Sequence, residues 1–379
     1  MRTILIAVML GTVLPTVGFA QPSQQWARQF GTPSNDEAWS VTSDCWGNVF
    51  VAGAVHGQLV RPVEGITDCY LSKYDSAGTL LWVRQWGTSG EDRAWEVVVD
   101  QCGTAWVVTE NAGWGDPEGD AFLTSFTSNG THRGTWSVGR VTGKFSRTVS
   151  LSLAPNFRVL VARNAPSKKE SFITAFDMAG CQCWSQRYQY DDEYRLGDIT
   201  TDRCGNIYVA LGRNRLGFFG NVSRLDGCGR EIWTRSFGEN SSASSVAVDG
   251  RGHIWVGGAH LSSSQDAKIA EYLPDGTMLW SKIASGSGLT EVASLVVGHD
   301  CAFSTGLFRN QRGDDQYVAR FDANRLAWST QIGTHCSSSG VIGMDGGGHL
   351  LVSGVVRGTL SGQQPVGLND AFVIRYARQ

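Results

Sequence analysis

The sequence predicts an all-β fold made of repeated four-stranded sheets, and three observations carry that prediction. Glycine accounts for 47 of 379 residues and charged residues for only 18%, against about 25% charged residues in an average domain. Apolar and polar residues alternate with the period of two that marks a strand. A pattern that ends in tryptophan returns along the whole chain. Many short strands joined by tight turns account for all three features.

The tryptophan pattern sets the length of the repeat. Seven of the 14 tryptophans close equivalent stretches, such as DCYLSKYDSAGTLLW and DQYVARFDANRLAW, at intervals of 47 to 56 residues. They are Trp26, Trp82, Trp136, Trp184, Trp233, Trp280 and Trp328. An interval of roughly 48 residues is the size of one propeller blade. We therefore expect one blade per copy.

Four strands can be placed in each copy. A first apolar stretch ends in an Asp-x-x-Gly turn and a second strand follows, as in SVAVDGRGHIWVGG, residues 245–258. A third strand such as YLSKYD, residues 70–75, leads to another turn, and the fourth strand carries the tryptophan. Asp suits these turns because its side chain bonds the backbone two residues on, and Gly because it accepts a positive φ. A small sheet cannot bury both faces alone, so the copies should stack around an axis.

The two ends of the chain determine the number of blades. The region after the leader opens with a fourth strand, QQWARQFG (Gln24–Gly31), and the chain closes with a third strand, DAFVIRYARQ (Asp370–Gln379). Together they complete one blade. The sequence therefore predicts a seven-bladed β-propeller over residues 21–379, with four antiparallel strands per blade and the last blade closed by pairing of the N- and C-terminal strands. Such closure removes exposed sheet edges.

The repeat units resemble a known family. DCYLSKYDSAGTLLWVRQWGTSGEDRAWEVVVDQCGTAWVV (residues 68–108) and GNVSRLDGCGREIWTRSFGENSSASSVAVDGRGHIWVGG (residues 220–258) are similar to the bacterial seven-bladed β-propeller repeats called SBBP repeats. The resemblance covers nearly the whole mature chain and is weaker around residues 139–170, which lack the Asp-x-x-Gly turn. It implies an exported propeller and brings neither a settled activity nor a catalytic motif.

Residues 1–20 have the three-part pattern of a secretory signal peptide. Arg2 precedes an apolar run from Ile4 to Val17, and the small residues Gly18 and Ala20 stand before Gln21. We expect cleavage after Ala20 and a secreted or periplasmic protein. The alternative is a membrane anchor, for which the run is short and interrupted by a proline. No second apolar segment approaches the length of a membrane span.

Nine cysteines are compatible with disulfides in an exported chain. Cys204 and Cys228 are the best candidates for a bond, because both lie in turns on the same side of one blade. The odd number leaves at least one thiol unpaired in the monomer. No Cys or His spacing matches a zinc site.

The sequence contains no recognisable catalytic motif. It has neither a G-x-S-x-G elbow nor HExxH, and the glycine-rich stretch Asp345–His349 precedes a strand rather than a helix. The recurring acids occupy equivalent turn positions, where Asp is favoured for local hydrogen bonding. These acids are Asp44, Asp100, Asp202, Asp249 and Asp345. We expect no catalytic, cofactor or metal role for them, and the net charge of −3 gives no reason to expect a nucleic-acid partner.

The loops of such a propeller divide between two faces. Turns after first and third strands are short and uniform, whereas the other loops vary, and variable loops on a rigid scaffold usually carry function. Trp39 and Trp95 lead into innermost strands behind acidic residues, and Trp114 and Asp116 lie in the polar loop NAGWGDPEGD. The acids before the two tryptophans are Asp36, Glu37, Glu91 and Asp92. We take the three tryptophans and Asp116 as candidate ligand contacts. We expect no required cofactor, and calcium is the ion that these acidic loops could bind.

The function predicted from these features is a binding or interaction scaffold that uses the variable loops. Its partner is an unknown protein or carbohydrate, and we expect a monomer. The alternative is an enzyme, a lyase or hydrolase acting on a polysaccharide or lactone at the mouth of the central channel. That alternative requires polar residues from several blades to converge, among them His56, His260 and His335.

Overall fold

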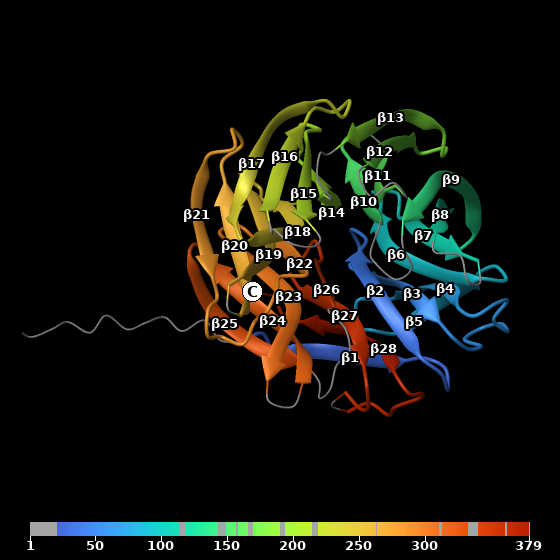
Figure 1. Cartoon of the computed structure of the whole chain (residues 1–379). Coiled ribbons are helices and arrows are strands. Elements are labelled where there is room, and N and C mark those ends of the chain that lie inside the picture. Colours follow the sequence, from blue (N-terminus) through green and yellow to red (C-terminus); the bar gives the residue numbers. More distant parts are fainter. Residues whose placement is uncertain are drawn as a thin grey trace, which may run out of the picture.

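The computed structural model shows small antiparallel sheets arranged around a central axis (Figure 1). It describes residues 21–113, 118–142, 149–156, 158–165, 170–189, 194–213, 219–262, 264–310, 313–332, 340–360 and 362–378. The predicted signal peptide, residues 1–20, lies outside these ranges. Within them, the chain forms no helix of the length and apolar character needed to cross a bilayer.

Blades one to four each consist of four consecutive antiparallel strands. Blade one contains β2 (Asp36–Ser43), β3 (Val49–Val55), β4 (Asp68–Tyr74) and β5 (Leu80–Trp86). Blade two contains β6 (Glu91–Val99), β7 (Ala105–Ala112), β8 (Glu118–Phe126) and β9 (His132–Thr142). Blade three contains β10 (Val149–Ala154), β11 (Arg158–Asn164), β12 (Glu170–Asp177) and β13 (Gln182–Gln189). Blade four contains β14 (Tyr194–Thr201), β15 (Ile207–Arg213), β16 (Phe219–Leu225) and β17 (Glu231–Glu239).

Blades five to seven complete the ring. Blade five contains β18 (Ser241–Val248), β19 (Ile254–Leu261), β20 (Gln265–Tyr272) and β21 (Met278–Ile283). Blade six contains β22 (Ser294–Val297), β23 (Cys301–Asn310), β24 (Gly313–Asp322) and β25 (Arg325–Ile332). Blade seven contains β26 (Val341–Met344), β27 (Leu350–Val356) and β28 (Asp370–Tyr376), with β1 (Gln24–Phe30) as its fourth strand. The seven-bladed, four-stranded architecture predicted from the sequence is confirmed.

The termini close the ring as predicted. β1 pairs antiparallel with β28, with Ala27 opposite Ile374 and Phe30 opposite Ala371, and the blue and red strands lie side by side in Figure 1. The innermost strands of neighbouring blades contact each other around the axis, including β26 of blade seven against β2 of blade one. Blade seven is therefore built from strands of both ends of the chain.

The recurring tryptophan and the recurring turn glycine pack against each other between blades. Trp26, on the outer strand of blade seven, is buried, and its indole N–H donates to Ser76 O (3.0 Å) in a turn of blade one. Gly78 in that turn has a φ of +81°, and a Cβ on it would stand 2.7 Å from the Trp26 ring. Both the backbone and the ring therefore require glycine. The pairs Trp82–Gly130, Trp136–Gly180, Trp184–Gly229 and Trp233–Gly276 repeat the contact.

The turn aspartates bond the backbone, as expected. In blade five, Asp249 Oδ1 accepts the N–H groups of Arg251 (2.8 Å) and His253 (2.9 Å). The same pair of bonds forms at Asp44, Asp100, Asp202 and Asp345. These carboxylates are used to shape the turns.

Side chains on the innermost strands link five of the seven blades to the next by an equivalent hydrogen bond. Ser245 Oγ accepts the Leu295 N–H of the following blade at 3.2 Å. Equivalent bonds are accepted by Ser40, Glu96, Asp198 and Ser294. By strand register, blade seven has Val341 at this position, and valine cannot accept a hydrogen bond. The junction between blades seven and one therefore lacks this bond.

The cysteines in the described part of the chain are all free thiols, Cys204 and Cys228 included. The bond predicted between those two is therefore not formed in the structure. Their turns do lie against each other, since a Cβ on Gly227 would stand 3.2 Å from Gly205 O. Peptide mapping without reductant would show whether the pair forms on export.

Candidate functional site

Antiparallel strands place the loops of each blade on two faces. We call the face with the turns after first and third strands the turn face, and the opposite face the loop face. On the loop face, residues 31–35 and 56–67 and the described residues between β27 and β28 (357–360 and 362–369) form three neighbouring loops of blades seven and one. Leu368 N–H donates to Ser34 O and His56 N–H to Asn35 O, both at 3.2 Å. The loop 31–35 thus lies between the other two and contacts both.

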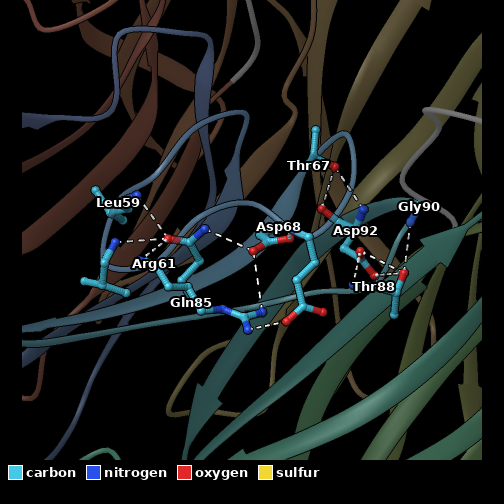
Figure 2. Close-up of polar contacts among 10 residues, drawn as sticks. Leu59, Arg61, Thr67, Asp68, Gln85, Thr88, Gly90 and Asp92 are labelled. Atoms are coloured by element: carbon cyan, nitrogen blue, oxygen red, sulfur yellow. Dashed lines mark hydrogen bonds and ion pairs between the residues drawn. The ribbon is translucent and has the colours of Figure 1, made fainter.

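Gln85 and Asp68 hold the loop between β3 and β4 in place (Figure 2). Gln85 Oε1 accepts the N–H groups of Leu59 and Val60, both at 3.0 Å, and its Nε2 donates to Asp68 Oδ2 at 3.0 Å. Arg61 of the same loop lies 3.6 Å from that carboxylate. Asp68 is fully buried, so these bonds are shielded from water and are stronger than they would be on the surface.

Asp92 joins this loop to blade two, as Figure 2 also shows. Its carboxylate accepts the Thr88 N–H (2.7 Å), and its own N–H donates to Thr67 Oγ1 (2.9 Å). Oxygens of Asp68 and Asp92 both come within 3.0 Å of the point where a Cβ on Gly87 would stand, so only glycine fits there. Burial raises the pKa of Asp92 to about 6; the bonds from Thr88 oppose the rise, and the charge of Asp68 adds to it.

Blades seven and one are joined in the same way. Gln29 Oε1 accepts the Leu360 N–H (2.8 Å), and its Nε2 donates to Asp370 Oδ2 (2.7 Å). The Asp36 carboxylate accepts the Thr32 N–H, just as the Asp92 carboxylate accepts the Thr88 N–H. Burial raises the pKa of Asp36 to about 6. Our sequence reasoning missed these Gln–Asp pairs. The pattern that could have revealed them is a Gln three residues after the tryptophan, in WARQ and WVRQ, together with an Asp that opens the third strand.

The loops held by these pairs carry exposed aliphatic side chains. Val60 is 53% exposed, Val366 50% and Leu368 69%, and Pro33 on the loop between them is exposed as well. We call these four residues the loop-face patch. Single exposed apolar residues are normal on a surface, whereas several on loops that contact one another make those loops a candidate interaction surface.

Trp39 and Trp95 come together, but only Trp39 is accessible. Each lies at a β-bulge of an innermost strand, and the ring centroids are 5.1 Å apart. Trp95 is 3% exposed, and its indole N–H donates to Glu110 Oε2 (2.9 Å). The ring of Trp95 therefore lies in the core, in one cluster with Val108 and Leu151, and its role as a ligand contact stays a prediction. Trp39 is partly exposed, and its binding role stays a prediction.

Trp114 and Asp116 lie outside the described residues, so the structure leaves their proposed role as a prediction. The acids near Trp39 and Trp95 already have partners. Glu91 Oε2 lies 3.2 Å from Arg93 Nη1. Burial raises the pKa of Glu37, and the charge of Arg93 opposes that rise. A calcium ion on this face would have to compete with these donors, and its binding also stays a prediction.

One group of three potential metal ligands occurs in the described part of the chain, on the turn face. Ligand atoms of Asp249, His253 and Glu271 lie within 4.8 Å of one another. Arg251 Nη2 lies 2.9 Å from Asp249 and 3.4 Å from Glu271, and His253 Nδ1 lies 2.7 Å from Glu271. The guanidinium therefore contacts both carboxylates in this structure, and a cation at this group would have to displace it.

The histidines that the enzyme alternative requires do not meet where the structure describes them. His56 Nδ1 contacts Asn35 O (2.7 Å) in blade one, and His260 Nδ1 contacts Ser241 Oγ (3.3 Å) in blade five. His335 lies outside the described residues.

Ser241 has the neighbours of a nucleophile but not the access. Lys268 Nζ donates to Ser241 Oγ at 3.0 Å, and Ser–Lys pairs do serve as nucleophile and base in some enzymes. Ser241 is fully buried, so a substrate cannot reach its hydroxyl in this structure. By strand register, Ser241 stands where Asp36 stands in blade one. The Ser–Lys contact thus replaces a buried carboxylate at the junction of blades four and five.

The sheets, their closure and their junctions define the chain as a seven-bladed β-propeller. It is similar to the Pan2 WD40 domain of Neurospora crassa (TM-score 0.56, 10% identity, 94% of this chain and 96% of that one). It is also similar to the polysaccharide lyase Uly1 (TM-score 0.54, 10% identity, 91% and 90%). A third similar structure is Raptor of Chaetomium thermophilum (TM-score 0.59, 10% identity), where 94% of this chain spans 28% of the other.

At 10% identity these likenesses show the fold alone. No protein-family model and no curated protein matches the chain. What is confirmed is therefore the propeller fold, and the fold by itself does not determine an activity.

Proposed function

We propose that the protein is an exported scaffold that binds a protein partner through the loop face of blades seven and one. The loop-face patch carries this proposal, because Val60, Val366 and Leu368 project from loops that buried Gln–Asp pairs hold in place. Loops that are already ordered lose little conformational entropy when they bind. Aliphatic side chains suit the apolar centre of a protein interface.

A protein partner fits this surface better than a carbohydrate. A sugar ring stacks on an exposed aromatic face, whereas Trp95 is buried and the patch is aliphatic. Arg61 and Glu64 form an ion pair at the edge of the patch and supply the polar rim that such interfaces have.

Export belongs to the same proposal. The leader pattern of residues 1–20 and the resemblance to SBBP repeats support a secreted or periplasmic protein, and we take it to act as a monomer. The enzyme alternative, a lyase or hydrolase, calls for histidines of several blades to converge at the channel mouth, and His56 and His260 do not contact each other.

Matched charge substitutions test the binding surface. Leu368→Asp should abolish retention of the partner that the wild-type protein captures from an extract of the producing cells. Leu279→Asp is the control, because Leu279 is also exposed but lies on the outer strand β21. Equal retention by both variants would contradict the proposal.

A further inference from the structure

A cavity of about 780 Å³ opens on the turn face, away from the loop-face patch. It forms where the turn of blade three, between Ala154 and Arg158, is shorter than the turns of its neighbours. Blade two has residues 100–104 between its first and second strands, and blade four has residues 202–206. The short turn of blade three leaves a hollow between two longer ones. The first-to-second turn of blade three lacks the Asp-x-x-Gly motif, as does that of blade six, whereas the third-to-fourth turn of blade three has it in DMAG (residues 177–180).

The wall of the cavity is largely apolar. It is lined by Val99, Leu153, Ala154, Pro155 and Met178, which come from blades two and three. Ligand sites for small molecules are typically 300–1,000 Å³ hollows of this character with a few polar groups. The size and lining therefore suit a small organic molecule rather than a macromolecule.

The two acids of the cavity are already used by their turns. Asp100 and Asp202 each accept two backbone N–H groups of their own turn through Oδ1. Their other oxygens accept the Trp106 indole N–H (3.2 Å) and the Tyr208 hydroxyl (3.1 Å). Neither carboxylate is therefore oriented to bind a cation in the cavity.

The two arginines of the cavity, by contrast, have guanidinium N–H groups that are available to bind a ligand. Arg133 and Arg203 are exposed and form no ion pair with any described residue. Arg133 Nη2 lies 3.4 Å from Met178 O, a long hydrogen bond, and its guanidinium stands 5.9 Å from the Trp106 ring. A guanidinium presents a planar set of donors that matches an oxyanion.

We propose that this cavity binds a small amphipathic organic anion. The apolar part of the ligand would lie on Leu153, Ala154 and Met178, and its carboxylate, sulfonate or phosphate group would bind Arg133 and Arg203. This site is separate from the loop face, so it does not depend on the function proposed above.

A pair of fluorescent probes tests this site in the mature full-length chain. The anion 8-anilinonaphthalene-1-sulfonate should bind, and Arg133→Gln and Arg203→Gln should each weaken its affinity by about five- to tenfold. Gln101→Lys, at an exposed lining position, should tighten it. N-phenyl-1-naphthylamine has a similar shape without the charge, and its affinity should be the same for all these variants.

Arg230→Gln is the matched control, because Arg230 is exposed on a turn of the same face and does not line the cavity. It should leave the affinity for the anion unchanged. Melting temperatures of all variants should match the wild type, since the substituted side chains are exposed. The proposal is overturned if the Arg133→Gln/Arg203→Gln double variant binds the anion as the wild type does. It is also overturned if the wild type binds the uncharged probe as tightly as the anion.

Discussion

Replacing Trp233 with alanine should lower the unfolding free energy by about 3–5 kcal/mol. The ring is 8% exposed and lies in a core with Tyr208 and Tyr272. On its other side it meets Gly276 of the next blade, and its indole N–H donates to Pro274 O (3.2 Å). Truncation removes contacts from both blades and leaves a cavity at their junction, which explains why the expected loss is large.

Urea denaturation followed by circular dichroism measures this loss, with Trp46→Ala as the control. Trp46 is 63% exposed on a turn of blade one, so its loss should change the free energy by no more than about 0.5 kcal/mol. Equal losses in the two variants would refute the assignment of the repeated tryptophans to blade packing. A loss below about 1 kcal/mol at Trp233 would refute it as well, because the two blades would then pack equally well without the ring.

Three further perturbations follow from the junctions and the closure. Burial raises the pKa of Asp92 to about 6 from 3.8, so the folded state binds this proton more tightly and the stability from this carboxyl falls as pH rises from about 4 to 6. Asp92→Asn should remove that slope and melt higher than the wild type at pH 7.5; an unchanged pH profile would count against the raised pKa. Ser245→Ala should cost about 1–3 kcal/mol in urea denaturation, because the Leu295 N–H loses its acceptor; a loss near zero would show that water replaces the hydroxyl. Deletion of residues 370–379 should expose two sheet edges and cause self-association, which light scattering detects, whereas a monomer with an unchanged melting temperature would contradict the closure.

The architecture was predictable because the residues that build it are local and repeated. Each tryptophan recurs with its turn glycine, as Trp26 does with Gly78, and the two terminal half-blades can be recognised without any knowledge of distant contacts. The pairing of Ala27 with Ile374 follows from counting strands.

The loop-face junctions could not be predicted in the same way. The bond between Gln85 and Asp68 depends on the register of two strands, which alternation alone does not fix. The burial of Trp95 depends on a bulge between Ala94 and Glu96, because a bulge redirects a side chain. The cavity on the turn face lies beside one short turn of blade three, and how far neighbouring turns project over it is not visible in the sequence.

The claim that the loop face is the binding surface can be tested most directly by site-specific photo-crosslinking. A benzophenone amino acid would be placed at Leu368 on the loop face, at Trp46 on the turn face or at Leu279 on the outer edge, all exposed positions. Each protein would be irradiated in an extract of the producing cells and its products resolved by mass spectrometry. The account predicts one discrete crosslinked protein from position 368 that is absent from the other two. The same products from all three positions, or a discrete product only from position 46 or 279, would contradict it.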